Sequence, residues 1–274
     1  MFNGNMEMVV TDLDGTLLDD KQQVSARDLE TMNLLGDRGI CRVIATGRSF
    51  YSLRRVLPPE FPIDYLVFSS GIGIMEWKTK RMIKEHHLDA GDVHQTAEIL
   101  VQRQLDFMIH YPVPKNHRFG YVHSGKNNPD FYHRIELYKD FSHDLMGRYH
   151  EFGNASQLLS ITPAGESLYH EIRLATPELN VIRTTSPLDH RSLWIEFFPP
   201  GASKSLGSQE VCRQTGCDAK NVLAVGNDYN DLDLLHWAAC SAVVQNAPED
   251  LKQNFKTVSS HCESGFSDAV APFL

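Results

Sequence analysis

The chain has 274 residues, 42% of them hydrophobic, and its 26 Lys and Arg against 35 Asp and Glu give a formal net charge of -9 at pH 7. This length favours two domains, because a single core seldom grows to that size. The negative charge repels phosphate backbones and anionic headgroups, which argues against nucleic-acid and membrane partners. An anionic substrate would need a locally positive site.

The N-terminus and the cysteines favour a cytoplasmic protein. Residues 1–10 lack the basic start and the apolar run of a signal peptide. No later stretch approaches the roughly 18 apolar residues of a membrane span. The cysteines are five in number and include no C-x-x-C pair, which argues against a disulfide framework or a zinc knuckle. We expect reduced, mostly buried thiols.

Strand-like and helical segments alternate at both ends of the chain, which is typical of a parallel α/β sheet. The N-terminal segments are a strand over residues 6–13, a helix that begins at Ser25 with Asp28 three residues later, and strands over 41–45 and 64–68. The late segments are a helix over 203–214, a strand over 221–225, a helix near Leu232 and a strand over 241–244. We expect both ends to build one Rossmann-like sheet.

The middle of the chain has a different pattern, which predicts an inserted α+β domain. Its predicted strands cover residues 107–111, 158–162, 181–185 and 192–198, and its predicted helices cover 89–104, 129–138 and 165–174. Pro199, Pro200 and Gly201 form a plausible hinge at its end. The predicted organisation is therefore a discontinuous core of residues 1–87 and 201–274 with an inserted domain over residues 88–200.

The string T-D-L-D-G-T, residues 11–16, places Asp12 and Asp14 directly after the first apolar strand. Two carboxylates so close repel each other, so that either one takes up a proton or a cation lies between them, and hard divalent metals fit such oxygen ligands. Gly15 lets the chain turn away sharply. Taken alone, the string is more often a solvated turn with an Asp helix cap.

Two further strings offer groups that bind phosphate. Thr46, Gly47 and Arg48 follow the second strand with a hydroxyl, a flexible backbone amide and a fork-shaped cation. Lys204 opens a helix, whose N-terminus attracts anions. By itself, T-G-R is more often a helix cap, and a lone lysine is more often a surface residue.

A third string, G-N-D-Y-N-D over residues 226–231, again follows an apolar strand. Its acids and amides are candidate metal ligands or supports of such ligands: Asn227, Asp228, Asn230 and Asp231. In isolation this string is a loop rich in turn-forming residues. The strings all stand at strand ends or a helix start and in a fixed order, which chance explains poorly.

Together the strings resemble the four motifs of the haloacid dehalogenase-like (HAD) superfamily. The segment lengths resemble its Cof-type branch, which carries a large α+β cap of the C2 type between the second and third motifs. Residues 265–270 also resemble the closing helix of that branch. The resemblance covers nearly the whole chain and implies a Mg²⁺-dependent phosphohydrolase of small phosphate monoesters, such as a sugar phosphate or a related metabolite.

The resemblance also implies a role for each matching residue. Asp12 matches the nucleophile that forms an aspartyl-phosphate, and Asp14 matches the general acid and base. Asp12 and the backbone carbonyl of Asp14 would ligate Mg²⁺. Thr46 and Lys204 match the residues that clamp the phosphate.

In the last motif, Asn230 matches an asparagine that contacts phosphate, and Asp231 matches an acid that supports the metal ligands. The branch usually has G-D-x-x-N-D, so Asn227 stands where the metal-binding aspartate is expected and Asp228 is displaced by one residue. Both remain rival Mg²⁺ ligands, with involvement of both preferred. The branch often has S-N-G after its third strand, where this chain has serine at Ser70, which still offers a hydrogen bond to substrate.

Other interpretations remain open at this stage. A phosphotransferase or phosphomutase uses the same aspartyl-phosphate, and a weakly active sensor would bind a phosphometabolite without turnover. The cap would close over the site and read the leaving group, and the candidate readers are guesses among strand residues: His110, Tyr111, Arg118 and Tyr121. The sequence allows a monomer or a small homo-oligomer.

Overall fold

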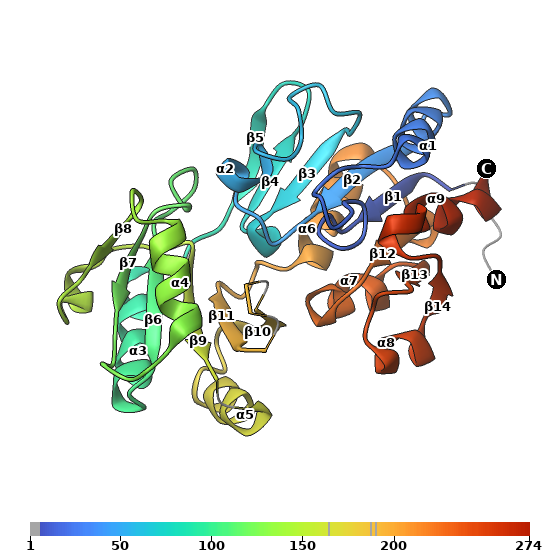
Figure 1. Ribbon diagram of the computed structural model, residues 1–274. Helices are drawn as coiled ribbons and strands as arrows, with labels where there is room; N and C mark the ends of the chain where they lie inside the picture. Colours follow the sequence, from blue (N-terminus) through green and yellow to red (C-terminus); the bar gives the residue numbers. More distant parts are fainter. Residues whose placement is uncertain (1–5, 164, 187, 190) are drawn as a thin grey trace. The chain divides into compact units, whose positions relative to one another are not determined.

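The computed structural model describes residues 6–163, 165–186, 188–189 and 191–274. The first five residues of the N-terminal segment considered above lie outside the described residues. The chain divides into two compact units, unit 1 with Met1–Glu85 and Ser203–Leu274, and unit 2 with His86–Ala202 (Figure 1). The crossings predicted from the sequence stood near residues 88 and 200.

Unit 1 is built on an eight-stranded sheet in the order β14-β13-β12-β1-β2-β3-β4-β5 (Figure 1). The pairs from β14 to β3 are parallel, and β4 and β5 extend the sheet as antiparallel strands. The strands are β1 (Met8–Thr11), β2 (Cys41–Ala45), β3 (Tyr65–Phe68), β4 (Gly73–Glu76), β5 (Arg81–Glu85), β12 (Val222–Gly226), β13 (Cys240–Val244) and β14 (Lys256–Val258). The predicted α/β class with a parallel core is confirmed.

Helices cover this sheet because its central strands are apolar on both faces. Met8 and Val10 of β1 share a core cluster with Val211 of α6 and Leu234 of α7, whereas α1 contacts β2 and α9 contacts β12. The helices are α1 (Ala26–Asp37), α2 (Phe50–Leu53), α6 (Lys204–Thr215), α7 (Leu232–Trp237), α8 (Glu249–Asn254) and α9 (Gly265–Val270). Short 3-10 helices are η1 (Ser69–Gly71), η3 (Ala219–Asn221), η4 (Tyr229–Asp231), η5 (His261–Glu263) and η6 (Ala271–Phe273).

Unit 2 has a six-stranded sheet in the order β10-β11-β9-β6-β7-β8, antiparallel except for the pair β7 and β8. Its strands are β6 (Asp106–His110), β7 (Phe119–Val122), β8 (Ser142–Asp144), β9 (Gln157–Thr162), β10 (Asn180–Thr185) and β11 (Leu193–Phe198). Its helices are α3 (Ala90–Gln102), α4 (Pro129–Leu137), η2 (Tyr149–Glu151) and α5 (Glu166–Ala175). Phe107 packs with α3 and α5, and Met108 packs with Phe131 of α4, because successive strand residues point to opposite faces.

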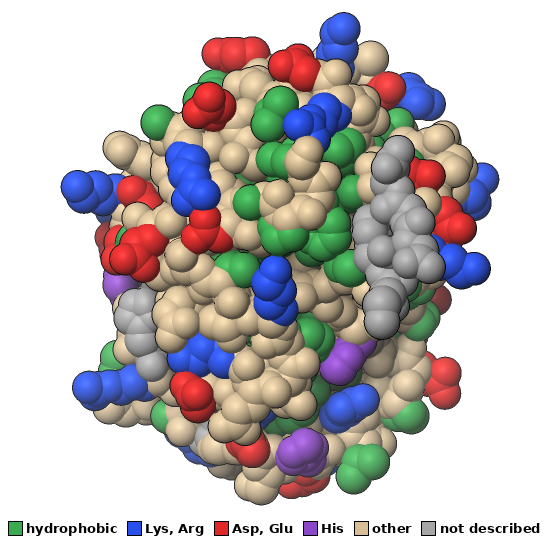
Figure 2. Space-filling view, turned by 90° about the vertical axis from the view of Figure 1, so that its right-hand side faces the viewer, with side chains coloured by type: hydrophobic (Ala, Val, Ile, Leu, Met, Phe, Trp, Pro, Cys, Tyr) green, Lys and Arg blue, Asp and Glu red, His purple; other side chains and the backbone are tan. Residues whose placement is uncertain are grey.

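Two further features concern membrane-spanning helices and the charge of the surface. No helix among the described residues is long and apolar enough to cross a membrane. On the face drawn in Figure 2, basic and acidic side chains of the described residues are interspersed.

The expectation of mostly buried cysteines is wrong. All five thiols are free, but only Cys212 is buried, while Cys41, Cys217 and Cys240 are half-buried. Cys262 is exposed, because it lies in the single turn of η5 and not inside a strand or a packed helix.

His110, a guessed substrate reader, is a buried residue of the unit 2 sheet, only 4% exposed. Its Nδ1 lies 2.9 Å from the carbonyl oxygen of Asn116, so that the ring donates from Nδ1, and its buried Nε2 has no hydrogen-bond partner among the described residues. Burial, assisted by the charge of Arg134, lowers the pKa of His110 to about 3. The ring is therefore neutral in the folded protein.

This burial predicts a loss of stability in acid. The histidine pKa is about 6.5 in the unfolded chain and about 3 in the folded chain. Between these pH values the unfolded chain binds a proton that the folded chain does not bind, so the free energy of unfolding falls as the pH falls. We expect urea denaturation to show that the wild type loses about 2 kcal/mol more than His110→Asn between about pH 6 and pH 4.5. The asparagine keeps a donor for Asn116 but does not titrate. The exposed-site control His150→Asn should keep the wild-type slope, and an unchanged slope in His110→Asn contradicts the prediction.

Candidate active site

Three of the motif strings, together with Ser70, lie at one edge of the unit 1 sheet. Asp12 follows β1, Thr46 follows β2, Ser70 lies just after β3, and Asn227 follows β12. These four strands are parallel neighbours, so their carboxyl ends lie side by side (Figure 1). The chain connects outward in opposite directions from β1 and β12, and ligands bind in open α/β sheets at such a switch of strand order.

A buried lysine joins two carboxylates at the centre of this edge. Lys204, the first residue of α6, places its Nζ 2.7 Å from Asp12 Oδ1 and 2.6 Å from Asp231 Oδ1. The three residues are 1%, 4% and 0% exposed in that order. The surface-lysine interpretation is therefore wrong. Ser203 caps the helix by accepting a hydrogen bond from the backbone of Leu206, which fixes where α6 begins.

The charges of this triad depend on one another. Burial opposes the charge on Lys204, but the carboxylates of Asp12 and Asp231 raise its pKa, so the ammonium stays protonated. Burial raises the pKa of Asp12 to about 7, against the lowering effect of Lys204. The nearby negative charges of Asp231 and Asp14 raise it further. Asp12 therefore needs a second cation to be fully ionised at neutral pH.

Asp231 fixes the loop that carries the last motif. Its Oδ2 accepts hydrogen bonds from the backbone nitrogens of Asn227 at 2.9 Å and Asp228 at 3.2 Å, while its Oδ1 binds Lys204. One carboxylate thus ties the loop after β12 to the first residue of α6.

Asn227 points its side chain at the first motif. One terminal atom of its amide lies 3.3 Å from Asp12 Oδ2, 3.2 Å from the carbonyl oxygen of Asp14 and 3.3 Å from Thr16 Oγ1. The amide nitrogen in that place donates hydrogen bonds to the three oxygens, whereas the amide oxygen in that place makes a cluster of oxygens that would suit a cation. A Cβ on Gly15 would lie 2.7 Å from Asn227 Nδ2, so glycine, with φ of +69°, permits this approach.

Asp228 serves the local backbone. Its Oδ1 accepts a hydrogen bond from the nitrogen of Tyr229 at 2.7 Å, and with Asp231 it forms a capping box at the start of η4. In η4 the side-chain oxygen of Asn230 is buried without a hydrogen-bond partner among the described residues, so it is available to a ligand.

Asp14 is held by an arginine fork. Arg48 Nε lies 3.0 and 2.8 Å from the two carboxylate oxygens of Asp14, and its Nη2 lies 2.6 Å from Oδ1. The backbone nitrogen of Arg48 donates to the buried hydroxyl of Thr46 at 3.1 Å. The residue predicted to hold phosphate therefore contacts the predicted acid and base.

The ends of β2 and β3 come together around Ser70. Its backbone nitrogen donates to the carbonyl oxygen of Thr46 at 3.0 Å, and a Cβ on Gly47 would lie 3.6 Å from Ser70 Oγ. Ser70 is buried and has a left-handed φ of +53°. All the predicted site residues thus lie at the carboxyl edge of one sheet.

Two polar residues at this edge were not predicted. Thr16 Oγ1 donates to Asp12 Oδ2 at 3.3 Å, and Asn246 Nδ2 donates to the carbonyl oxygen of Gly15 at 2.8 Å. The signal for Asn246 is its position just after β13, the parallel neighbour of β12. Thr16 stands inside the first string, where only its acids drew attention.

The backbone of Gly71, which follows β3, packs against the backbone of Ser203, the residue before α6. Its φ is +95°, and a Cβ there would lie 2.3 Å from the carbonyl oxygen and 2.6 Å from the nitrogen of Ser203. We expect Gly71→Ala to lower the free energy of unfolding by about 2–4 kcal/mol, from left-handed strain and backbone overlap together. Gly39→Ala is the matched control, because φ there is +72° and a Cβ meets nothing within 4 Å. Equal costs for the two variants in urea denaturation would show that no overlap occurs.

Comparison with known proteins agrees with this geometry. The sequence matches the haloacid dehalogenase-like hydrolase family over residues 9–274. It is 22% identical to the 5-amino-6-(5-phospho-D-ribitylamino)uracil phosphatase YwtE of Bacillus subtilis, over 98% of this chain and 97% of that protein.

Two solved structures share the fold. The phosphatase BT1666 of Bacteroides thetaiotaomicron superposes with a TM-score of 0.80 at 19% identity, covering 98% of this chain and 95% of that one. The subclass IIB sugar phosphatase BT4131 gives a TM-score of 0.77 at 18% identity, covering 97% and 98%. The resemblance of the motifs is confirmed: the chain belongs to the haloacid dehalogenase-like hydrolases and is a phosphatase.

Proposed function

We propose that this phosphatase hydrolyses a small phosphate monoester, such as a sugar phosphate or a related metabolite, through an aspartyl-phosphate on Asp12 and with Mg²⁺ as cofactor. The observation that carries the proposal is the buried Asp12 carboxylate at the end of β1, 2.7 Å from Lys204 and beside Asn227 and Asp14. The substrate class is supported by two similar proteins, because BT4131 is a sugar phosphatase and YwtE is a 5-amino-6-(5-phospho-D-ribitylamino)uracil phosphatase.

The donor set beside Asp12 fits Mg²⁺. One terminal atom of the Asn227 amide lies 3.3 Å from Asp12 Oδ2 and 3.2 Å from the carbonyl oxygen of Asp14, and oxygen donors are the ligands that Mg²⁺ prefers. A cation bound there would be held by oxygens of Asp12, Asp14 and Asn227. It would also lower the raised pKa of Asp12 and screen the approach of an anionic phosphate to an anionic nucleophile.

The proposed reaction has two steps. A carboxylate oxygen of Asp12 attacks phosphorus, the ester P–O bond breaks, and Asp14 gives its proton to the leaving oxygen. Asp14, now a carboxylate, takes a proton from water, whose oxygen attacks phosphorus and restores Asp12 with release of phosphate. Lys204 and Thr46 bind the phosphoryl oxygens, and Ser70 and Asn230 offer further polar contacts.

Arg48 positions Asp14 in this scheme, because its fork donates hydrogen bonds to both carboxylate oxygens of Asp14. Arg48 is also proposed to bind the substrate phosphate, as the sequence suggests. Unit 2, with its place in the chain between the second and third motifs, is proposed as the cap that recognises the leaving group.

A panel of phosphate monoesters tests the function. Purified protein with Mg²⁺ should release inorganic phosphate from small sugar phosphates faster than from nucleotides or phosphoproteins, and EDTA should stop the release. If no panel member yields phosphate, the proposed substrate class is wrong.

The rival metal ligands can be separated by titration. We expect Asn227→Ala to raise the Mg²⁺ concentration for half-maximal rate by about tenfold or more, since outer partners of metal ligands alone account for that much. Asp228→Ala should lower stability by about 1 kcal/mol through loss of the η4 cap, with a smaller change in Mg²⁺ response. A larger Mg²⁺ effect in Asp228→Ala than in Asn227→Ala would assign the ligand to Asp228.

A further inference from the structure

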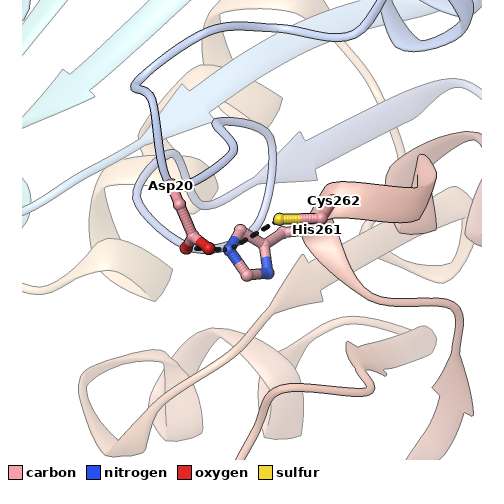
Figure 3. Close-up of side chains that lie close together, drawn as sticks. All are labelled: Asp20, His261 and Cys262. Carbon is pink, nitrogen blue, oxygen red and sulfur yellow. Dashed lines mark hydrogen bonds and ion pairs between the residues drawn. The ribbon is translucent and has the colours of Figure 1, made fainter.

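Three different metal-binding groups meet on unit 1 outside the proposed catalytic residues. Asp20 lies in the turn that follows the first motif, and His261 and Cys262 lie in η5 (Figure 3). The ring Nε2 of His261 lies 2.9 Å from Asp20 Oδ1 and 3.5 Å from Cys262 Sγ. All three donor atoms lie within 4.8 Å of one another. The fold thus gathers oxygen, nitrogen and sulfur from segments about 240 residues apart.

These separations suit a tetrahedral ion. Zinc bonds of about 2.0–2.1 Å to nitrogen or oxygen and about 2.3 Å to sulfur place tetrahedral ligands about 3.3 Å apart for nitrogen with oxygen and about 3.6 Å apart for nitrogen with sulfur. The two separations from His261 Nε2, 2.9 and 3.5 Å, therefore differ from these values by a few tenths of an ångström, and the Asp20 oxygen and Cys262 Sγ lie within 4.8 Å of each other. Figure 3 shows the imidazole between the other two side chains.

The segments that carry the donors are held by other contacts. The backbone nitrogen of His261 donates to Asn246 Oδ1 at 3.2 Å, and Asn246 Nδ2 donates to the carbonyl oxygen of Gly15. Asp19 Oδ1 accepts from two backbone nitrogens of the Asp20 turn. The His261 side chain is 13% exposed and that of Asp20 84%, so an ion can reach the site from solvent.

An ordinary surface ion pair between Asp20 and His261 is the plainer interpretation, and such pairs contribute little stability. An ion pair of that kind does not require a third group, yet the thiol of Cys262 also contacts Nε2 of His261. Cys262 is an exposed cysteine, so its thiol is accessible to an ion from solvent.

We propose that Asp20, His261 and Cys262 form a binding site for one borderline divalent metal ion of the Zn²⁺ class, separate from the Mg²⁺ site. Thiolate and imidazole select such ions, whereas Mg²⁺ prefers oxygen ligands, so the two sites differ in chemistry and share no residue. When the ion binds, the thiol loses its proton to solvent, the neutral His261 ring carries its proton on Nδ1 so that Nε2 binds the ion, and the fourth position is left to water.

Cobalt serves as the probe, because Co²⁺ replaces Zn²⁺ and a thiolate ligand gives it a charge-transfer band in the near ultraviolet. The reduced full-length protein, kept in excess Mg²⁺, should bind one Co²⁺ per chain with that band, and Zn²⁺ should displace it. Cys262→Ser should abolish the band. His261→Ala and Asp20→Asn should raise the dissociation constant for Zn²⁺ by about tenfold or more. Zn²⁺ should raise the melting temperature of the wild type and not of Cys262→Ser.

Cys240→Ser and His236→Ala are matched controls on other elements of unit 1, and both should keep the band and the affinity. The proposal is overturned if Co²⁺ binds without the band, or if Cys262→Ser and Cys240→Ser behave alike. It is also overturned if Asp12→Asn removes the band while His261→Ala keeps it, because the ion then occupies the catalytic edge.

Discussion

Asp12→Asn should lower phosphate release by about 10⁴-fold or more, because an amide oxygen cannot form the acyl phosphate and removal of a nucleophile costs that much in comparable enzymes. The fold should not suffer. The amide oxygen can still accept the hydrogen bond that Lys204 donates, and the substitution removes a buried carboxylate that lies beside the negative charges of Asp231 and Asp14. We expect equal or higher stability in urea denaturation, so lost activity cannot be ascribed to unfolding.

The companion measurement looks for the intermediate. Asp14→Asn should slow the attack of water and let the phosphoryl group accumulate on Asp12, where mass spectrometry of acid-quenched peptides would find it. Asp37→Asn, an exposed carboxylate in α1, is the control and should turn over at the wild-type rate. Full activity in Asp12→Asn would place the nucleophile elsewhere.

Much of the fold follows from local signals. Ser25 caps α1 by accepting a hydrogen bond from the nitrogen of Asp28, as the spacing of the two residues predicts. Every predicted helix and strand is present, with bounds that differ by two residues or fewer. The apolar runs of β1 and β12 mark central strands because both faces of those strands are covered.

Two strands that the sequence did not predict, β5 and β14, lack that signal. Residues of β5 are half-buried or exposed in no strict alternation, and β14 is a short edge strand whose residues are mostly exposed. A partly exposed strand places no demand for apolar residues on the sequence, and only its pairing partner reveals it.

The residues of the site also divide into those that the sequence locates and those that it does not. The motif strings locate Asp12, Asp14 and Lys204 at strand ends and a helix start, because connectivity alone puts them there. Connectivity does not say which of two adjacent residues turns inward. Asn227 faces Asp12 because Asp231 holds the backbone of the loop, a contact made by side-chain geometry four residues away.

The buried Lys204 should be the most costly single residue of the site to lose. Lys204→Met has similar length but leaves the carboxylates of Asp12 and Asp231 uncompensated in the interior, and breaking a buried ion pair on one side costs about 3–5 kcal/mol. We expect that loss in urea denaturation of the metal-free protein. Added Mg²⁺ should restore part of the stability, because a cation bound at Asp12 supplies positive charge. Lys220→Met, an exposed control, should change stability by less than about 0.5 kcal/mol.

A double-mutant cycle then isolates the interaction. Asp231→Asn keeps an oxygen for the backbone nitrogens of Asn227 and Asp228 but removes its charge. When residue 231 is already a neutral asparagine, Lys204→Met leaves only the carboxylate of Asp12 without its partner. The double variant should therefore be more stable, by about 1–3 kcal/mol, than the sum of the two single effects predicts. Effects that add to within about 0.5 kcal/mol would mean that the lysine and Asp231 do not stabilise each other, and the electrostatic account of this triad would then be wrong.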